Sequence, residues 1–142
     1  MSEQERVPDM STAMFRTLTE TMGMDPAWIA SELDVSERTV RGWATMKPDG
    51  YVPVFARLWI REWWATFQDR VADAIEGALD MEVAQEQEFS YATIARYKSD
   101  RSLRRAGVDM PLSMHSALVG LVAFGLEQAD ISARVVWREE EM

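Results

Sequence analysis

Apolar residues spaced three and four positions apart predict helices in the first part of the chain. Asp9 or Ser11 can cap the first of these helices, because both side chains accept hydrogen bonds from free amides. Gly23 breaks the pattern just after Met22. The residues expected on the buried side of this helix are Met14, Phe15, Leu18 and Met22.

Two shorter helices are predicted next, with a turn between them. Asp25 and Pro26 mark a helix start, since Asp caps the first turn and Pro fits the first helical position. Asp34 stands where the chain must turn, and Asp tolerates left-handed backbone geometry better than most residues. Ser36 can cap the following helix, which we expect to run from Glu37 to about Ala44.

A long helix is predicted from Pro53 to about Leu79. Aromatic residues recur every four positions in its first half, and we expect this stripe to form core rather than a ligand surface. The opposite face of the later half is charged, which is typical of a connecting strut. The aromatic stripe consists of Phe55, Trp59, Trp63 and Phe67.

The last third of the chain alternates differently and predicts a small α+β module. The expected fold class is therefore mainly α, with a bundle of short helices, a long connecting helix and this small C-terminal module. Residues 89–97 alternate like a strand, and residues 131–137 are β-branched and apolar. Residues 99–105 fit a short helical turn, and Pro111 opens a helix that reaches about Glu127. That helix is apolar almost all round, so we expect it to be buried. Because a two-stranded sheet alone is only marginally stable, we expect a partner chain to complete the sheet.

Composition excludes several classes of protein. The 142 residues contain no cysteine, which excludes disulfides and thiolate metal sites. The polar, charged start of the chain resembles no targeting peptide, and the longest apolar run, near 117–124, is too short for a membrane span. We therefore expect a cytoplasmic protein that does not contact membranes.

The net charge of −9 argues at first sight against a nucleic-acid partner. The charge is uneven, however. Residues 65–100 hold three Lys/Arg against eight Asp/Glu, a net of −5, whereas residues 10–64 hold six against seven, a net of −1. A local basic face in the first third is compatible with these numbers, because the local field matters more than the total.

The window from Pro26 to Ala44 reads PAWIASELDVSERTVRGWA. It resembles the helix-turn-helix of the Cro/repressor-like superfamily, often named XRE. Ala30 is small where two helices would approach closely, and Val40 and Trp43 would hold the inner face of the second helix. Ala44 departs from the pattern, because many relatives carry Glu there, and the following loop is less defined as a result.

This resemblance implies that the second helix lies in the major groove of duplex DNA. Arg38 and Arg41 share one exposed face and can reach guanine, although a solvated surface role is the alternative for both. Glu37 can accept from cytosine or repel phosphate. Lys47 is the candidate for a phosphate contact after the helix, with a plain loop lysine as the alternative. The remaining candidates for DNA contact are Ser36, Thr39, Gly42 and, on the first helix, Arg16.

The order of elements after Trp43 is similar to that of YdiL-like and anti-CRISPR-associated regulators. That similarity implies a homodimer that represses from an inverted-repeat operator. The expected domains are a helix-turn-helix domain over 10–66, a continuing helix over 67–82, and a dimerisation module over 87–138. The residues expected at the dimer contact are Leu118, Val122, Val135, Val136, Trp137 and His115.

Two other functions compete with this reading. The first is a protein-interaction module, such as an antitoxin or an inhibitor of a host protein. It would keep the helix-turn-helix as a scaffold and bind its partner through the acidic strut (69–88) or the C-terminal module. The second is an enzyme that uses His115, the sole histidine, as a general base. We expect instead that His115 makes a hydrogen bond in the core or at an interface, because no nucleophile or paired acid stands nearby. A lone histidine also lacks partners for zinc, so no metal or cofactor is expected.

Overall fold

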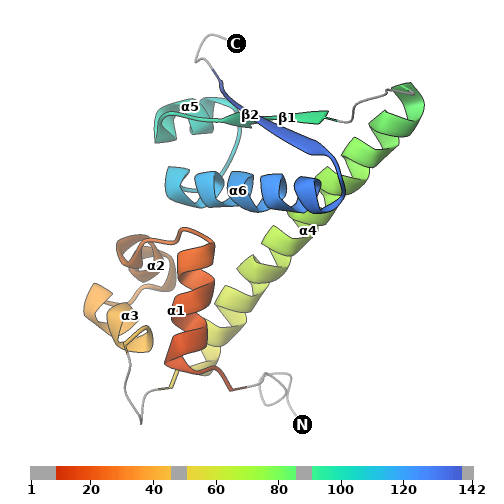
Figure 1. Cartoon of the computed structure of the whole chain (residues 1–142). Coiled ribbons are helices and arrows are strands. Elements are labelled where there is room, and N and C mark those ends of the chain that lie inside the picture. The colour runs from red at the N-terminus through yellow and green to blue at the C-terminus, as the bar shows by residue number, and fades with distance from the viewer. Residues whose placement is uncertain (1–8, 46–50, 86–90, 139–142) are drawn as a thin grey trace. The chain divides into compact units, whose positions relative to one another are not determined.

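The structure of the chain, a computed structural model, describes residues 9–45, 51–85 and 91–138. Over these residues the chain is mainly helical with one small sheet near its C-terminal end, which confirms the predicted class at this level. The chain divides into two compact units, Met1–Thr66 and Phe67–Met142. The elements in order are α1 (Thr12–Thr21), α2 (Pro26–Leu33), α3 (Glu37–Trp43), α4 (Val54–Gln85), β1 (Tyr91–Arg96), α5 (Asp100–Arg105), α6 (Leu112–Gln128) and β2 (Ser132–Trp137) (Figure 1).

Side-chain caps start the three short helices of the first unit. The Ser11 hydroxyl accepts from the Met14 amide at 3.0 Å, so of the two candidate caps for α1 it is Ser11 that is used. Asp25 accepts from the Ala27 amide at 2.8 Å and begins α2. Each contact satisfies an amide that has no partner inside its helix. The predicted starts of α1 and α2 are therefore confirmed.

The core of the first unit is built from the buried faces of its helices. Phe15 and Leu18 of α1 and Met22 just after it are buried as expected, together with Ile29 of α2. Met14 is exposed, which corrects its assignment to the buried side of α1. It directly precedes Phe15, so on a helix it lies about 100° away from the stripe that packs inward.

The aromatic stripe of α4 is only partly core. Phe67 is buried, and Trp59 and Trp63 are half-buried, with the Trp28 ring 5.6 Å and 5.9 Å from them. Phe55 is exposed, so the expectation that the whole stripe is buried is wrong at its first member. Phe55 lies in the first turn of α4, where the neighbouring Ala56 and Arg57 are the buried residues.

Helix α4 also ends later than its pattern predicts. It reaches Gln85, six residues beyond the expected end at Leu79. The added segment, DMEVAQ, contains good helix formers and no Gly or Pro. The helix therefore continues on intrinsic propensity where its apolar spacing has already faded. No helix in the described part of the chain is both long and apolar enough to span a membrane.

In the second unit, β1 and β2 lie side by side and run parallel. Their register pairs Tyr91 with Ser132 and Arg96 with Trp137. Parallel neighbours need a long crossover connection, which α5 and α6 supply here. Helix α6 packs along both strands (Figure 1). The expectation of a helix between two adjacent strands is confirmed; residues 89 and 90 of the predicted first strand, and the acidic tail, lie outside the described residues.

Helix α6 is not buried all round. Phe124 is 66% exposed, which corrects the expectation drawn from its apolar composition. Composition states how apolar a helix is, but the number of neighbours decides how much of it is covered. The buried positions, spaced four residues apart along one side, are Met114, Leu118, Val122 and Leu126, with Val119 beside them.

Candidate nucleic-acid interface

The turn between α2 and α3 has the backbone geometry expected from its sequence. Asp34 adopts φ 54° and ψ 49°, in the left-handed region. The Val35 amide then donates to the Ala30 carbonyl at 3.0 Å, which satisfies a carbonyl at the end of α2. Ser36 follows in extended geometry and accepts from the Thr39 amide at 3.1 Å. The predicted cap of α3 is confirmed.

Two side chains anchor the inner face of α3. Val40 is 1% exposed and Trp43 is 7% exposed. The Trp43 ring lies edge-on between Phe15 of α1, at 5.7 Å, and Phe55 of α4, at 5.6 Å. Such edge-to-face pairs add to the stabilisation that burial itself provides. Because both anchors face inward, the orientation of the whole helix is fixed.

The outer face of α3 carries most of the residues predicted to contact DNA. Ser36, Glu37, Arg38, Thr39 and Arg41 are all exposed. Arg38 makes no hydrogen bond or ion pair with any described residue. Gly42 is half-buried, and a Cβ atom added there would meet nothing within 4 Å.

Several polar groups of this face bind one another. The Arg41 guanidinium donates to the Glu37 carboxylate at 3.3 Å, four residues away on the same helix. The hydroxyls of Ser36 and Thr39 are 2.9 Å apart. An exposed i,i+4 ion pair contributes only about 0.3–0.5 kcal/mol, so a ligand with its own negative charge can displace it. Arg38 is the cation of α3 that is available without such a rearrangement.

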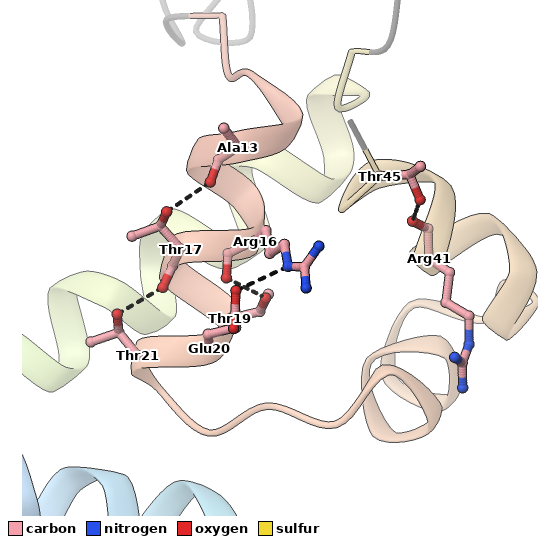
Figure 2. Close-up of polar contacts among 8 residues, drawn as sticks. All are labelled: Ala13, Arg16, Thr17, Thr19, Glu20, Thr21, Arg41 and Thr45. Carbon is pink, nitrogen blue, oxygen red and sulfur yellow. Dashed lines mark hydrogen bonds and ion pairs between the residues drawn. The ribbon is translucent and has the colours of Figure 1, made fainter. Parts of the chain in front are cut away.

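Of the two outlying candidates, only Arg16 lies among the described residues, and it pairs with a carboxylate of its own helix. Arg16 points toward Glu20 on α1, with 3.1 Å between the guanidinium and the carboxylate (Figure 2). The hydroxyls of Thr17 and Thr21 on the same helix donate back to main-chain carbonyls (Figure 2). Lys47 lies outside the described residues.

The candidates for a dimer contact fall into two groups. Leu118 and Val122 are buried within the chain, so little of either side chain is left for a partner. Val135, Val136 and Trp137 of β2 are exposed. The apolar pattern marks both groups alike, because it does not distinguish a side chain covered by its own chain from one left open.

His115 does not make the hydrogen bond expected of it in the core of the chain; the alternative, a hydrogen bond at an interface, stays a prediction. His115 is half-buried, with its ring edge-on to Tyr97 at 5.3 Å, and its buried Nδ1 atom has no hydrogen-bond partner in the described structure. Burial, and secondarily the positive charge of Arg70, lower the pKa of His115 below its usual 6.5. Its packing against an aromatic ring takes the place of the expected polar contact.

Cations and aromatic rings also meet on the sheet, where the sequence analysis assigned the cations no role. The guanidinium of Arg96 lies 5.2 Å from the Trp137 ring, and the Lys98 ammonium lies 5.9 Å from it. Arg134 lies 4.4 Å from the Tyr91 ring. Each strand carries one aromatic residue and one arginine, Tyr91 and Arg96 in β1 and Arg134 and Trp137 in β2, and only the pairing of the strands brings them together.

Among the described residues, no group of three or more His, Cys, Asp or Glu side chains gathers in a way that could hold a metal ion. Comparison of the sequence with models of known protein families and with curated proteins gives no match.

Proposed function

We propose that the chain is a sequence-specific regulator that binds double-stranded DNA, with α2, the turn at Asp34 and α3 as its helix-turn-helix. In this proposal α3 enters the major groove, and the regulator is a homodimeric repressor on an inverted repeat. The observation that carries the proposal is the division of α3 into a buried side, Val40 and Trp43, and an exposed side with Arg38 and Arg41.

The exposed side suits base recognition because of where its groups lie. Arg38 and Thr39 stand in the first turn of α3, the part of a recognition helix that reaches base edges. A guanidinium binds O6 and N7 of guanine through two parallel hydrogen bonds, which discriminates that base by about 1–3 kcal/mol. Arg41 follows one turn later and can bind a neighbouring base or a phosphate once it leaves Glu37.

The net charge of −9 opposes binding to DNA less strongly than its size suggests. Exposed acidic residues occur at intervals of four, three and four along α4, which places them on one side of that helix: Asp69, Asp73, Glu76 and Asp80. Negative charge on α4 weakens non-specific binding to phosphate, whereas the exposed side of α3 itself carries Arg38 and Arg41. Specific contacts would then supply most of the affinity.

A selection of DNA sites from a random double-stranded pool with the full-length chain tests the proposal. The expected outcome is an enriched inverted repeat whose binding weakens steeply as salt rises, since counterions are released from the phosphates. Failure to enrich any sequence over the starting pool, at low salt and with folded protein, would contradict it.

The acidic side of α4 supports a second candidate function, a protein-interaction module. Its partner would present a basic surface to Asp69, Asp73, Glu76 and Asp80. Replacing these four residues by Asn or Gln should then abolish capture of a stoichiometric partner. The same replacement should leave or increase DNA affinity if the first proposal holds, so the two are separable in one variant.

A further inference from the structure

The outer edge of β2 is open over a short, well-defined stretch. The Arg138 amide donates across the sheet to the Arg96 carbonyl at 2.9 Å, so Arg138 faces β1. In a parallel pair, alternate residues of a strand bond to the same neighbour. Val136 and Arg134 therefore also face β1, whereas Ala133, Val135 and Trp137 direct their main-chain groups away from it.

One end of this outer edge is closed by a side chain. The Glu127 carboxylate accepts from the Ala133 amide at 2.8 Å. This bond agrees with the outward direction of the Ala133 main chain that follows from Arg138, because an amide bonded to β1 would not be available to Glu127. The amides of Val135 and Trp137 are left as the outward donors of the described strand.

The side chains along the same stretch are uncovered as well. Val135 is 45% exposed, Val136 40% and Trp137 56%. Successive residues of a strand point to opposite faces, so exposure of three in a row means that side chains on both faces are partly accessible here, including the face against which α6 packs. The β1 strand differs, because Ala92, Ile94 and Ala95 are half-buried. An open apolar edge of this kind is a template for another strand.

We infer that a second copy of the chain pairs with this edge, β2 against β2 in antiparallel orientation, with a two-fold axis at Val135. The two Val135 residues then exchange both main-chain hydrogen bonds. Each Trp137 amide reaches the Ala133 carbonyl of the other copy, and the Ala133 amide needs no further partner because Glu127 holds it. The two short sheets become one sheet of four strands, which is more stable than either alone.

Charge favours this register over its neighbour. An axis at Val136 would place Arg134 directly opposite Arg138 of the other copy, and like charges opposite one another destabilise a strand pair. With the axis at Val135, Arg134 lies opposite Val136. The same short stretch thus complements itself, as a contact with two-fold symmetry requires. The inference gives the proposed regulator the two-fold contact that an inverted repeat demands, and to that extent rests on the proposed function.

The absence of cysteine makes a direct test possible, because any introduced cysteine is the sole thiol. In the full-length chain, Val135→Cys is expected to form a covalent dimer under mild oxidation, since residues opposite each other on paired strands lie within disulfide reach. Val136→Cys should react much less, because it would be diagonal to its copy. Thr93→Cys, on the exposed side of β1, is the matched control and should stay monomeric under the same conditions.

A second pair of variants tests the edge without a thiol. Val135→Pro removes an outward amide only, so the fold should survive, with an unchanged circular dichroism spectrum, while the mass in solution falls from dimer to monomer. Val136→Pro removes a bond to β1 and should unfold the second unit.

A wild-type chain that stays monomeric at all concentrations would overturn the inference, as would crosslinking of Val135→Cys no faster than Thr93→Cys. Crosslinking that peaks at Val136→Cys would overturn the register. A monomer that still selects one DNA site would contradict this inference alone and leave recognition by α3 standing.

Discussion

The contribution of single residues is clearest on α3, where a carboxylate stands among the groups proposed to face DNA. Glu37 binds Arg41 at 3.3 Å, and both side chains are largely exposed. Its charge opposes phosphate, and its contact holds a cation that the proposal assigns to the duplex. Alternatively, the Glu37 carboxylate accepts a hydrogen bond from cytosine. Neutralising Glu37 should raise DNA affinity in the first case and lower it in the second.

We expect Glu37→Gln to raise affinity for the selected DNA site about two- to fivefold, the range that corresponds to loss of one weak exposed charge interaction. Fluorescence anisotropy titration at fixed salt measures this change. Glu20→Gln, which frees Arg16 on α1 in the same way, is the matched control and should change affinity less. A loss of affinity confined to Glu37→Gln would show that the carboxylate reads a base.

His115 gives the second unit a pH-dependent stability. Its pKa lies below 6.5 in the folded chain because burial, and then Arg70, disfavour the charged ring. The unfolded chain therefore takes up this proton first as the pH falls. Stability from this residue is intact above about 6.5 and is lost as the pH falls through 6.5 toward the lowered value of the folded state.

His115→Gln is accordingly expected to lose less stability than the wild type between pH 7.5 and pH 5.5. Urea unfolding at the two pH values, followed by circular dichroism, measures the difference. If variant and wild type lose the same free energy of unfolding over this range, His115 is not the responsible group.

Among the elements, the sequence predicted where helices begin better than where they end and which of their sides are buried. Ser11, Asp25 and Ser36 cap their helices as expected, because a cap depends on residues only two or three positions away. The extension of α4 to Gln85 and the exposure of Phe124 were missed. The exposure of Phe124 depends on which neighbours are present, and the end of α4 depends on helix propensity, so apolar spacing contains no information about either.

The same distinction holds for the candidate site. The left-handed turn at Asp34 and the inward anchors Val40 and Trp43 follow from short-range pattern, and the structure confirms these positions. The cations around Trp137, by contrast, follow from strand pairing. Pairing of β1 with β2 joins residues about forty positions apart, which alternation along each strand does not specify.

The packing of α6 on α4 within the second unit yields a test of an element contact. A Cβ atom at Gly125 would lie 2.8 Å from the Ile75 Cδ1 atom and 3.0 Å from the Val71 Cγ1 atom. Gly125→Leu should therefore destabilise the chain by about 1–3 kcal/mol through overpacking. At Gly120 on the same helix, an added Cβ atom would meet nothing within 4 Å. Gly120→Ala should instead stabilise by about 0.5–1 kcal/mol, since Ala favours a helix over Gly.

Urea unfolding of both glycine variants against the wild type measures these changes. Equal stability of Gly125→Leu and wild type would contradict the close approach of the two helices. Destabilisation by Gly120→Ala would contradict the open surroundings of that position.

At the scale of the whole molecule, the proposal combines a strongly acidic chain with a small cationic reading surface. Charge on the acidic side of α4 would suppress non-specific binding, and recognition would depend on a few directed contacts from α3. The edge of β2 would supply the two-fold symmetry that lets two such helices read one repeat. Affinity should then be unusually sensitive to single arginines of α3 and insensitive to arginines elsewhere.

The most direct measurement is the affinity for the selected DNA site of three single variants at one salt concentration. Arg38→Ala and Arg41→Ala should each weaken binding by about 1–3 kcal/mol, roughly 5- to 150-fold, with the helical spectrum unchanged. Arg101→Ala, which removes an exposed arginine of the second unit, should change affinity by less than about twofold. Equal, small losses in all three variants would show that binding depends on total charge alone and would contradict recognition by α3.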